Sequence, residues 1–206
     1  MPLVYQKEGD AFRLGLWKIE EDIPFFESAI NYRSNAANQE RAKQQLAARM
    51  ALQTVHENFP FNQVEILEGG KPVLRNNELK FSLSHCNGFS AAIISDKNEV
   101  GIDIEPVHER VLKIEKKFLN DHELNLLASA GAQHRVVYST LFWSLKETMY
   151  KWWGKGSVDF SREIQVVEFN TDDEGTAAIK FAKMPDTVFK LNYIRYENIW
   201  MTLLCK

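Results

Sequence analysis

Residues 134–153 read HRVVYSTLFWSLKETMYKWW and have the pattern of one long helix. At about 100° per residue, one face of this helix carries an apolar stripe made of Phe142, Leu145, Met149 and Trp152. Gly154 follows directly, and glycine commonly occupies the position just after a helix end. These residues predict a helix with one apolar face that ends at Gly154.

The N-terminal third of the chain reads as helical. Asp22 followed by Pro24 has the pattern of a helix cap and first turn. Apolar residues then recur at helical spacing between about residues 38 and 56. The cluster Gly69-Gly70-Lys71-Pro72 comes after this segment and predicts a turn.

After that turn the hydrophobic period changes to two, which is typical of half-buried strands. One strand is predicted at 81–84, and two more at 91–95 and 100–104 are expected to form a hairpin through the loop 96–99. The last fifty residues alternate again and predict antiparallel strands at 166–169, 178–181, 189–194 and 200–204. Interspersed helices and antiparallel strands predict the α+β fold class.

Composition excludes several classes of protein. The chain has 206 residues, and its 25 Lys and Arg against 28 Asp and Glu give a formal charge of −3, which argues against a wide nucleic-acid-binding face. The longest apolar run, Ala91 to Ile94, is far shorter than the ~20 residues of a membrane helix. The N-terminus, MPLVYQKEGD, lacks a secretory pattern, and Cys86 and Cys205 form no disulfide framework or zinc spacing. We therefore expect a cytoplasmic protein with no nucleic-acid and no membrane partner.

Two acidic residues share one face of a predicted strand. In Val-Gly-Ile-Asp-Ile-Glu, residues 100–105, Asp103 and Glu105 point to the side opposite the aliphatic residues, and their Cα atoms lie ~6.6–6.8 Å apart. Oxygen ligands of this kind suit Mg²⁺ or Ca²⁺. The alternative is a strand with its polar side in water, which this pattern alone favours.

The long helix carries a carboxylate between two lysines. Lys146 borders the apolar stripe, and Glu147 and Lys151 continue around its flank. Glu147 can bind a cation while either lysine meets phosphate as a point charge. The alternative is an ordinary Glu-to-Lys pair on an exposed helix, worth ~0.2–0.5 kcal/mol.

Further candidates are single residues. His85 ends a predicted strand and can donate to a phosphate, and Lys71 in its turn can meet an anion, although such residues are more often structural. Glu123 can be a site carboxylate or, with Asn120, a helix capping box. A basic cluster can dock an acidic partner or form a solvated face, and it consists of Arg110, Lys113, Lys116 and Lys117.

The joint order of these motifs resembles the 4′-phosphopantetheinyl transferases of the surfactin-synthetase-activating (Sfp-like) type. Gly-Lys-Pro, Phe-Ser-Leu-Ser-His, Val-Gly-Ile-Asp-Ile-Glu and Trp-Ser-Leu-Lys-Glu-Thr-Met-Tyr-Lys follow one another between about residues 70 and 156. The last two motifs are the specific ones. The resemblance implies an α+β pseudodimer of two similar halves, each a small antiparallel sheet packed on a long helix. We expect an N-terminal half at 1–99 and a C-terminal half at 100–206 that carries the metal site.

The resemblance also implies a reaction. Such enzymes move phosphopantetheine from coenzyme A to a serine of an apo acyl or peptidyl carrier protein, depend on Mg²⁺ and release adenosine 3′,5′-bisphosphate. The chain length suits the family's single-chain form, so we expect a monomer. An alternative is a non-catalytic module that binds coenzyme A or a carrier protein. Another Mg²⁺-dependent phosphotransferase has less support, because the chain has no G-x-x-x-x-G-K-[ST] loop.

By resemblance, the site residues take specific roles. Asp103, Glu105 and Glu147 would hold the metal ion. Glu147 or Glu123 would accept the proton of the carrier serine, and Lys151 would neutralise phosphate charge in catalysis. The remaining residues would contact coenzyme A, and they are Lys71, Ser84, His85, Lys146, Lys151 and, from the N-terminal half, Arg41, with Arg49 as the next choice.

Overall fold

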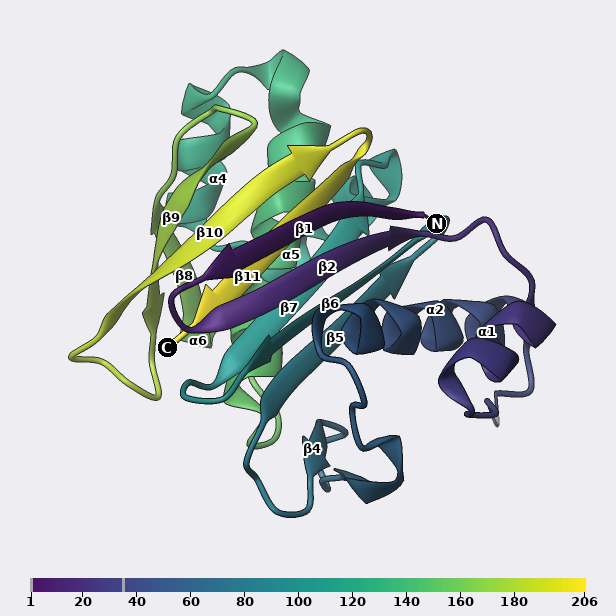
Figure 1. Ribbon diagram of the computed structural model, residues 1–206. Coiled ribbons are helices and arrows are strands. Elements are labelled where there is room, and N and C mark those ends of the chain that lie inside the picture. Colours follow the sequence, from purple (N-terminus) through teal and green to yellow (C-terminus); the bar gives the residue numbers. More distant parts are fainter. Residues whose placement is uncertain (1, 35) are drawn as a thin grey trace.

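The computed structural model describes residues 2–34 and 36–206, and Figure 1 shows their arrangement. Two antiparallel sheets dominate the fold. The first has the strand order β1-β2-β6-β5, with β1 at Leu3–Gly9, β2 at Phe12–Lys18, β6 at Phe89–Ser95 and β5 at Lys80–Cys86. The second has the order β7-β11-β10-β9-β8, with β7 at Val100–Pro106, β11 at Ile199–Cys205, β10 at Val188–Tyr196, β9 at Glu174–Phe181 and β8 at Ile164–Glu168. A small third sheet pairs β3 at Val64–Ile66 with β4 at Pro72–Leu74.

Helices fill the connections between the strands. The α-helices are α1 at Ile23–Ile30, α2 at Gln39–Val55, α3 at Glu115–Phe118, α4 at Asp121–Ser129, α5 at Arg135–Trp153 and α6 at Phe160–Glu163. Short 3₁₀ turns occur as η1 at Phe61–Gln63, η2 at Glu109–Lys113 and η3 at Ala132–His134. The α+β fold class is thereby confirmed.

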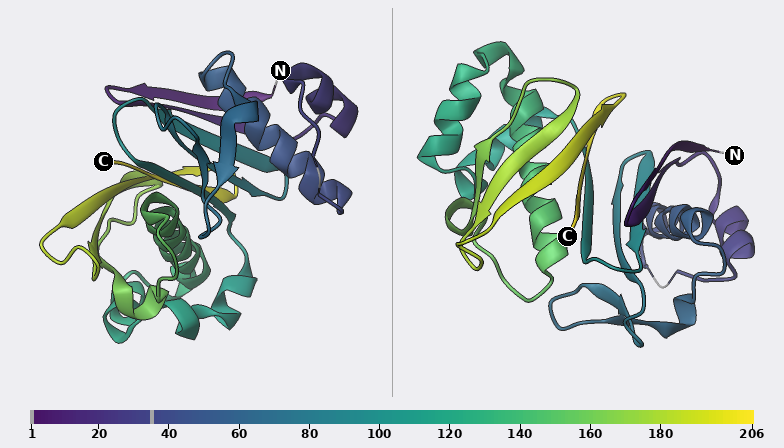
Figure 2. Two further views of the ribbon diagram at one scale, coloured as in Figure 1. Left: turned by 90° about the horizontal axis from the view of Figure 1, so that it is seen from below. Right: turned by 60° about the vertical axis from the view of Figure 1, so that its left-hand side comes forward.

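Each large sheet packs one long helix on its outer side. Helix α2 covers the first sheet and α5 covers the second, and Figure 2 shows the two helices on opposite sides of the pair of sheets. The inner faces of the two sheets share one apolar core, in which Leu14, Leu16 and Ile93 of the first sheet meet Ile102, Met201 and Leu203 of the second. The strands of the first sheet all precede residue 99 and those of the second all follow it. We propose residue 99 as the boundary between the two halves, whose similarity to each other stays a prediction.

Serine side chains join the two sheets where the edge strands β5 and β7 lie next to each other. Ser82 Oγ accepts a hydrogen bond from the backbone N–H of Ile102, and Ser84 Oγ accepts one from that of Ile104, both at 3.2 Å. These hydroxyls occupy the place that strand carbonyls take in a continuous sheet. The junction holds Asp103 of β7 close to Ser84 of β5.

Several predicted elements are confirmed, because local signals determine them. The long helix is α5, and Gly154 ends it in the left-handed conformation. The Asp22 side chain caps α1, and Asn38 caps α2. The four predicted C-terminal strands correspond to β8, β9, β10 and β11.

Two predictions about the N-terminal and central segments were wrong. The chain begins with the β1–β2 hairpin and not with a helix. Strands β6 and β7 exist but do not form a hairpin, because β6 lies between β2 and β5 and both of its edges are already paired. The loop at 96–99 instead crosses from one sheet to the other, and β7 pairs with the distant β11.

Candidate active site

Strand β7 presents its acidic face to helix α5. Its alternating side chains place Val100, Ile102 and Ile104 in the core between the sheets, so Asp103 and Glu105 point the other way. Gly101 shares that second face and lets the helix approach. A Cβ atom added there would meet the carbonyl oxygen of Thr148 and lie 2.9 Å from the backbone nitrogen of Trp152.

Asp103 is buried in a dense set of polar contacts. Its carboxylate accepts hydrogen bonds from Ser84 Oγ and from Ser144 Oγ, each at 2.9 Å, and forms an ion pair with Lys151 Nζ at 2.7 Å. Lys151 also donates to Ser84 Oγ at 2.9 Å. Three elements, β5, β7 and α5, therefore hold one neutralised pair at the junction of the sheets.

Glu105 and Glu147 carry the charge that the site leaves unbalanced. Burial and the negative charge of Asp103 raise the pKa of each carboxyl from 4.5 to about 7. Glu105 accepts a hydrogen bond from Trp143 Nε1 at 3.0 Å, which opposes part of this rise in pKa. Within residues 2–34 and 36–206, no hydrogen bond or ion pair to the Glu147 side chain is found. The pKa of each glutamate therefore lies close to neutral pH.

The three carboxyls predicted to hold a metal ion do not form a closed set of ligands among the described residues. The negative charge of Asp103 contributes to the raised pKa of both glutamates, and that of Glu147 contributes to the raised pKa of Glu105. Among the described residues, however, no three acidic, histidine or cysteine side chains are arranged so as to hold an ion. Asp103 is instead engaged by Lys151 and two serines.

Two neighbouring cavities form a cleft that reaches Glu147 of this cluster and is not lined by Asp103 or Glu105. One, of about 250 Å³, is lined at its inner end by Glu147, Tyr150 and Lys151. The other, of about 260 Å³, reaches Arg49 and His85. The two cavities share Gly70, Pro72, Phe81 and Leu83 as lining residues. The cleft is thus built by both halves of the chain.

Arg49 of α2 and His85 of β5 line the cavity that Glu147 does not line, here called the outer end of the cleft. Arg49 donates to the hydroxyl of Tyr32 at 3.3 Å and lies over its ring at 4.4 Å, so its guanidinium is held in place. Arg41 is exposed and near His85. Desolvation lowers the pKa of His85, and the charges of Lys151 and Arg41 lower it further. His85 is therefore a neutral donor or acceptor at pH 7.

Lys71 lines the cleft, but its ammonium is already bound. Its Nζ donates to Glu99 at 2.9 Å and to the carbonyl oxygen of Trp152 at 3.0 Å. The side chain is 13% exposed. Lys71 thus fastens the turn before β4 to the C-terminal end of α5, and we omit it from the proposed set of phosphate contacts.

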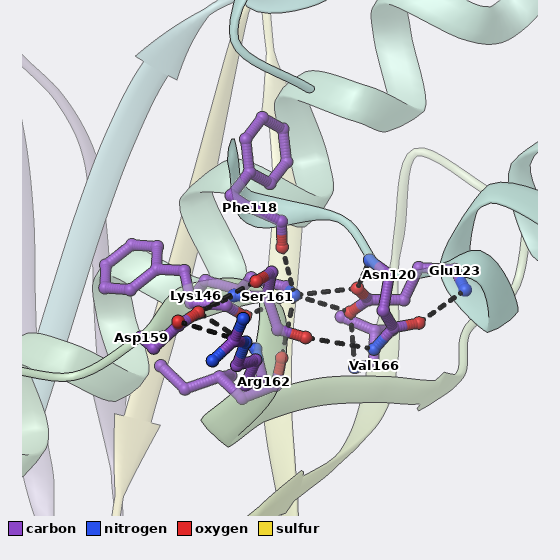
Figure 3. A network of polar contacts seen from close by, with 10 residues as sticks. Phe118, Asn120, Glu123, Lys146, Asp159, Ser161, Arg162 and Val166 are labelled. Atoms are coloured by element: carbon purple, nitrogen blue, oxygen red, sulfur yellow. Dashed lines mark hydrogen bonds and ion pairs between the residues drawn. The ribbon is translucent and has the colours of Figure 1, made fainter. Parts of the chain in front are cut away.

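Lys146 and Glu123 form a buried ion pair away from the cleft. Both side chains are 0% exposed, and Lys146 Nζ lies 2.7 Å from Glu123 Oε1. The Glu123 carboxylate also accepts the backbone N–H groups of Asn120 and Val166, so the capping box anticipated as one of two alternatives is present. Figure 3 shows Lys146 with Glu123, Asn120 and Val166 beside it. Because neither side chain reaches solvent, neither can touch a substrate in this arrangement.

Three residues of the site were missed by the sequence reasoning. Gly101, Ser144 and Trp143 received no role, although they bring α5 close, bind Asp103 and bind Glu105. Ser144 and Thr148 are small hydroxyl residues one turn apart on a buried face, and both contact Thr202 of β11. Such a line of hydroxyls beside an apolar stripe is the signal that would have revealed close helix–sheet contact.

The basic cluster lies on η2 and α3 and faces outward. Arg110, Lys113, Lys116 and Lys117 are all exposed, and the neighbouring Leu112 is 40% exposed. Glu115, in contrast, turns inward to a bidentate pair with Arg135 at 2.9 and 3.0 Å. The inward turn of Glu115 removes a negative charge from this surface.

Comparison with known proteins identifies the family. A model of the 4′-phosphopantetheinyl transferase superfamily matches residues 99–202, which include β7, α5 and all three candidate metal ligands. The chain belongs to this superfamily.

Within the described residues, no helix has the length and apolar character needed to cross a membrane.

Individual relatives carry matching names. The chain is 30% identical over 139 residues to 4′-phosphopantetheinyl transferase psf-1 of Bacillus pumilus, which covers 65% of this chain and 59% of the relative. It is 33% identical over 101 residues to 4′-phosphopantetheinyl transferase gsp of Aneurinibacillus migulanus, covering 49% and 40%. To 4′-phosphopantetheinyl transferase Sfp of Bacillus subtilis strain 168 it is 32% identical over 90 residues, covering 43% and 40%. The matched part of the chain thus spans between two fifths and three fifths of these relatives, and the Sfp-like resemblance is confirmed.

Proposed function

We propose that this chain transfers 4′-phosphopantetheine from coenzyme A to a serine hydroxyl of an apo acyl or peptidyl carrier protein, with release of adenosine 3′,5′-bisphosphate. Membership of the superfamily and the names of the relatives support this activity. The observation that carries it is the cleft, which runs from Arg49 and His85 to Lys151 and Glu147. A coenzyme A molecule lying along it would place its phosphates between basic groups and the acidic cluster.

A magnesium ion is part of the proposal, held by Asp103, Glu105 and Glu147. Carboxylate oxygens are the donors that Mg²⁺ prefers, and two of these carboxyls have pKa values raised to about 7 that a cation would lower again. Bound there, Mg²⁺ would offset negative charge on the pyrophosphate. Lys151 is paired with Asp103 at 2.7 Å, so Asp103 would hold the metal only if this lysine gave up that contact, for example to a phosphate.

The chain's own residues orient and neutralise the phosphates. Lys151 lies at the inner end of the cleft, where its ammonium can stabilise charge on the transferred group. Ser84 is fully used in binding Asp103, Lys151 and Ile104, so we assign it to positioning these groups. His85 and Arg49 contact the nucleotide end of coenzyme A, and Arg41 supplies further positive charge nearby.

Glu147 is our candidate for the general base. It lines the cleft, and its carboxylate has no hydrogen-bond or ion-pair partner among the described residues, so it is free to accept a proton. The serine proton would move to this carboxylate while the serine oxygen bonds to phosphorus and the bond to the adenosine-side phosphate breaks. Glu123, the other candidate, has both oxygens engaged in the buried ion pair and backbone hydrogen bonds.

The carrier protein would dock beside the exposed basic cluster of η2 and α3, because carrier surfaces around the modified serine are typically acidic. Two cavities adjoin this surface, and Trp143 lines both. The expectation of a cytoplasmic monomer stays a prediction.

Mass spectrometry of a carrier panel tests the activity. Fatty-acid, polyketide and peptide-synthetase carriers are incubated with the chain, coenzyme A and Mg²⁺, and the expected result is the added mass of phosphopantetheine on at least one carrier. Glu147→Gln should lower kcat at least 100-fold by removing the ionisable carboxyl. Glu168→Gln, an exposed glutamate on β8, is the matched control and should keep the rate. Binding of coenzyme A without any mass change would favour the non-catalytic module.

A further inference from the structure

The buried ammonium of Lys146 connects five elements at one point. It donates to the carbonyl oxygens of Phe118, Phe160 and Ile164 at 2.6, 2.8 and 2.7 Å, and it pairs with Glu123. These partners lie on α3, α6, the start of β8, and α4, while Lys146 itself belongs to α5 (Figure 3). The three N–H donors of an ammonium are shared among these four partners, so none is left free. Nothing of this group remains for a phosphate.

Two of these partners also enclose the indole of Trp143. Its ring centroid lies 5.1 Å from that of Phe118 in an edge-to-face contact and 5.5 Å from that of Phe160. Trp143 precedes Lys146 by three residues, so both side chains leave the same side of α5. The backbone positions that Lys146 fixes are therefore the ones that carry the two rings around the indole.

The indole in turn contacts the acidic cluster. Trp143 Nε1 donates to Glu105 at 3.0 Å, and the ring lines a cavity of about 750 Å³ on one side and a cavity of about 720 Å³ on the other. Ile114 lines both cavities as well, so the two cavities lie next to each other at Trp143 and Ile114. A shift of this ring would move the Glu105 carboxylate and the wall of both cavities together.

We propose that Lys146 and Glu123 are positioning residues that act through Trp143: the buried pair clamps the chain at Phe118 and Phe160, these rings fix the indole, and the indole orients Glu105. The inference rests on the proposed function, because Glu105 is there assigned to the metal. The family resemblance implied that Lys146 contacts a phosphate of coenzyme A. We assign it instead an indirect role, in which it positions other residues and does not touch the substrate.

A thermodynamic cycle between the pair and the indole tests this connection. Glu123→Gln with Lys146→Met removes both charges together, because a single substitution would leave one buried charge unpaired. Trp143→Phe keeps an aromatic ring but removes the N–H donor. The double variant and Trp143→Phe should each lower kcat at least 10-fold. The triple variant, which combines all three substitutions, should have a kcat no lower than that of the slower of these two variants. Multiplicative loss in the combined variant would overturn the proposal, since the groups would then act independently.

Binding measurements separate positioning from phosphate contact and from simple support of the fold. Both variants should bind Mn²⁺, followed by its electron paramagnetic resonance signal, about 10-fold more weakly, as is typical when a partner of a metal ligand is lost. Their dissociation constants for coenzyme A, measured by calorimetry, should stay within twofold of wild type. A tenfold weaker affinity for coenzyme A, or a lower melting temperature with unchanged kcat and Mn²⁺ affinity, would contradict the inference.

Lys183→Met provides a matched control. Lys183 follows β9 and pairs with Glu163 of α6 at 2.8 Å, so its loss removes a lysine contact to α6 that involves neither Trp143 nor Glu123. This variant should keep kcat and Mn²⁺ affinity within twofold. An equal loss in this variant would show that any weakening of α6 suffices and would overturn the specific role of Lys146.

A measurement on the wild-type protein covers the case in which the charge-removing variants fail to fold. ¹⁵N-lysine NMR should show a protected Lys146 ammonium signal, assigned through its proximity to Phe118 and Phe160. Addition of coenzyme A should shift the Lys151 signal and leave that of Lys146 in place. A shift of the Lys146 signal of equal size would overturn the proposal. If no carrier in the panel is modified, the proposed function fails, whereas the Mn²⁺ and NMR results still decide the positioning role.

Discussion

Asp103, Glu105 and Glu147 are three carboxylates in one site, but their surroundings differ. Asp103 is paired with Lys151 and accepts from two serines, so its charge is neutralised inside the protein. Glu105 has one indole donor, and Glu147 has the open cleft beside it. Charge repulsion in this site therefore raises the pKa of the two glutamates, and we expect their protonation to change with pH and with bound cations.

The pH dependence of stability should report these two residues. Their pKa is about 7 in the folded chain and near the ordinary 4.5 in the unfolded chain, so between these values the folded state holds more protons. The free energy of unfolding of the metal-free protein should therefore fall as pH rises from 5 to 8. Urea unfolding in the presence of a chelator at several pH values measures this change.

The double variant Glu105→Gln with Glu147→Gln separates the contribution of these two glutamates to the pH dependence of stability from that of other titrating groups. The variant cannot ionise at these positions, so it should lose less stability than wild type between pH 5 and 8. Parallel stability profiles for the two proteins would show that the glutamates titrate normally. Adding Mg²⁺ at pH 8 should stabilise wild type and leave the variant unchanged.

Strand β7 and helix α5 were predictable because their signals are local. The alternation of 100–105 and the apolar stripe of α5 depend only on neighbouring residues. Strand β2 was missed because it is buried on both faces over Leu14–Trp17 and so shows no alternation. The pairing of β7 depends on β11, whose residues lie 93 to 105 positions further along the chain. The burial of Lys146 depends on Phe118 and Phe160, which lie 28 and 14 positions away.

The contact between β7 and α5 depends on Gly101. In Gly101→Ala, the new methyl group meets the backbone of Thr148 and Trp152, which cannot rotate away as a side chain would. We expect a loss of about 1–3 kcal/mol in the free energy of unfolding. The transfer rate should fall as well, because Glu147 moves away from Asp103. Urea unfolding and the carrier mass assay measure the two effects.

Gly88→Ala serves as the comparison for that substitution. An added methyl group there meets no atom within 4 Å, although the positive φ of 82° makes the residue strained. It should lower stability through the backbone alone and leave the transfer rate within twofold. A Gly101→Ala variant that behaved in the same way would show that close helix–strand contact is unnecessary for the site.

At the scale of the whole molecule, one surface is suited to an acidic partner. The exposed cluster of η2 and α3 lies beside the cavities that adjoin Trp143 and Glu105. Reversing charge at two lysines, Lys113→Glu with Lys116→Glu, should raise the KM for the carrier several-fold at low salt. The effect should shrink at high salt, because exposed charges are screened beyond ~10 Å at 0.1 M.

Lys180→Glu with Lys190→Glu controls for the change in net charge. These exposed lysines lie on β9 and β10, so the variant gains the same negative charge on a different element. Its KM for the carrier should stay near that of wild type. Equal increases in both variants would indicate long-range repulsion and remove the docking assignment.

The serine junction between β5 and β7 has a consequence for association between chains. Each of these strands lies at the end of its sheet, and an unpaired strand edge can template the addition of a strand from another molecule. Here the hydroxyls of Ser82 and Ser84 accept hydrogen bonds from two N–H groups of β7. The edges of β5 and β7 therefore cover each other. The same contacts that bring the two halves together therefore protect both strand edges from intermolecular aggregation.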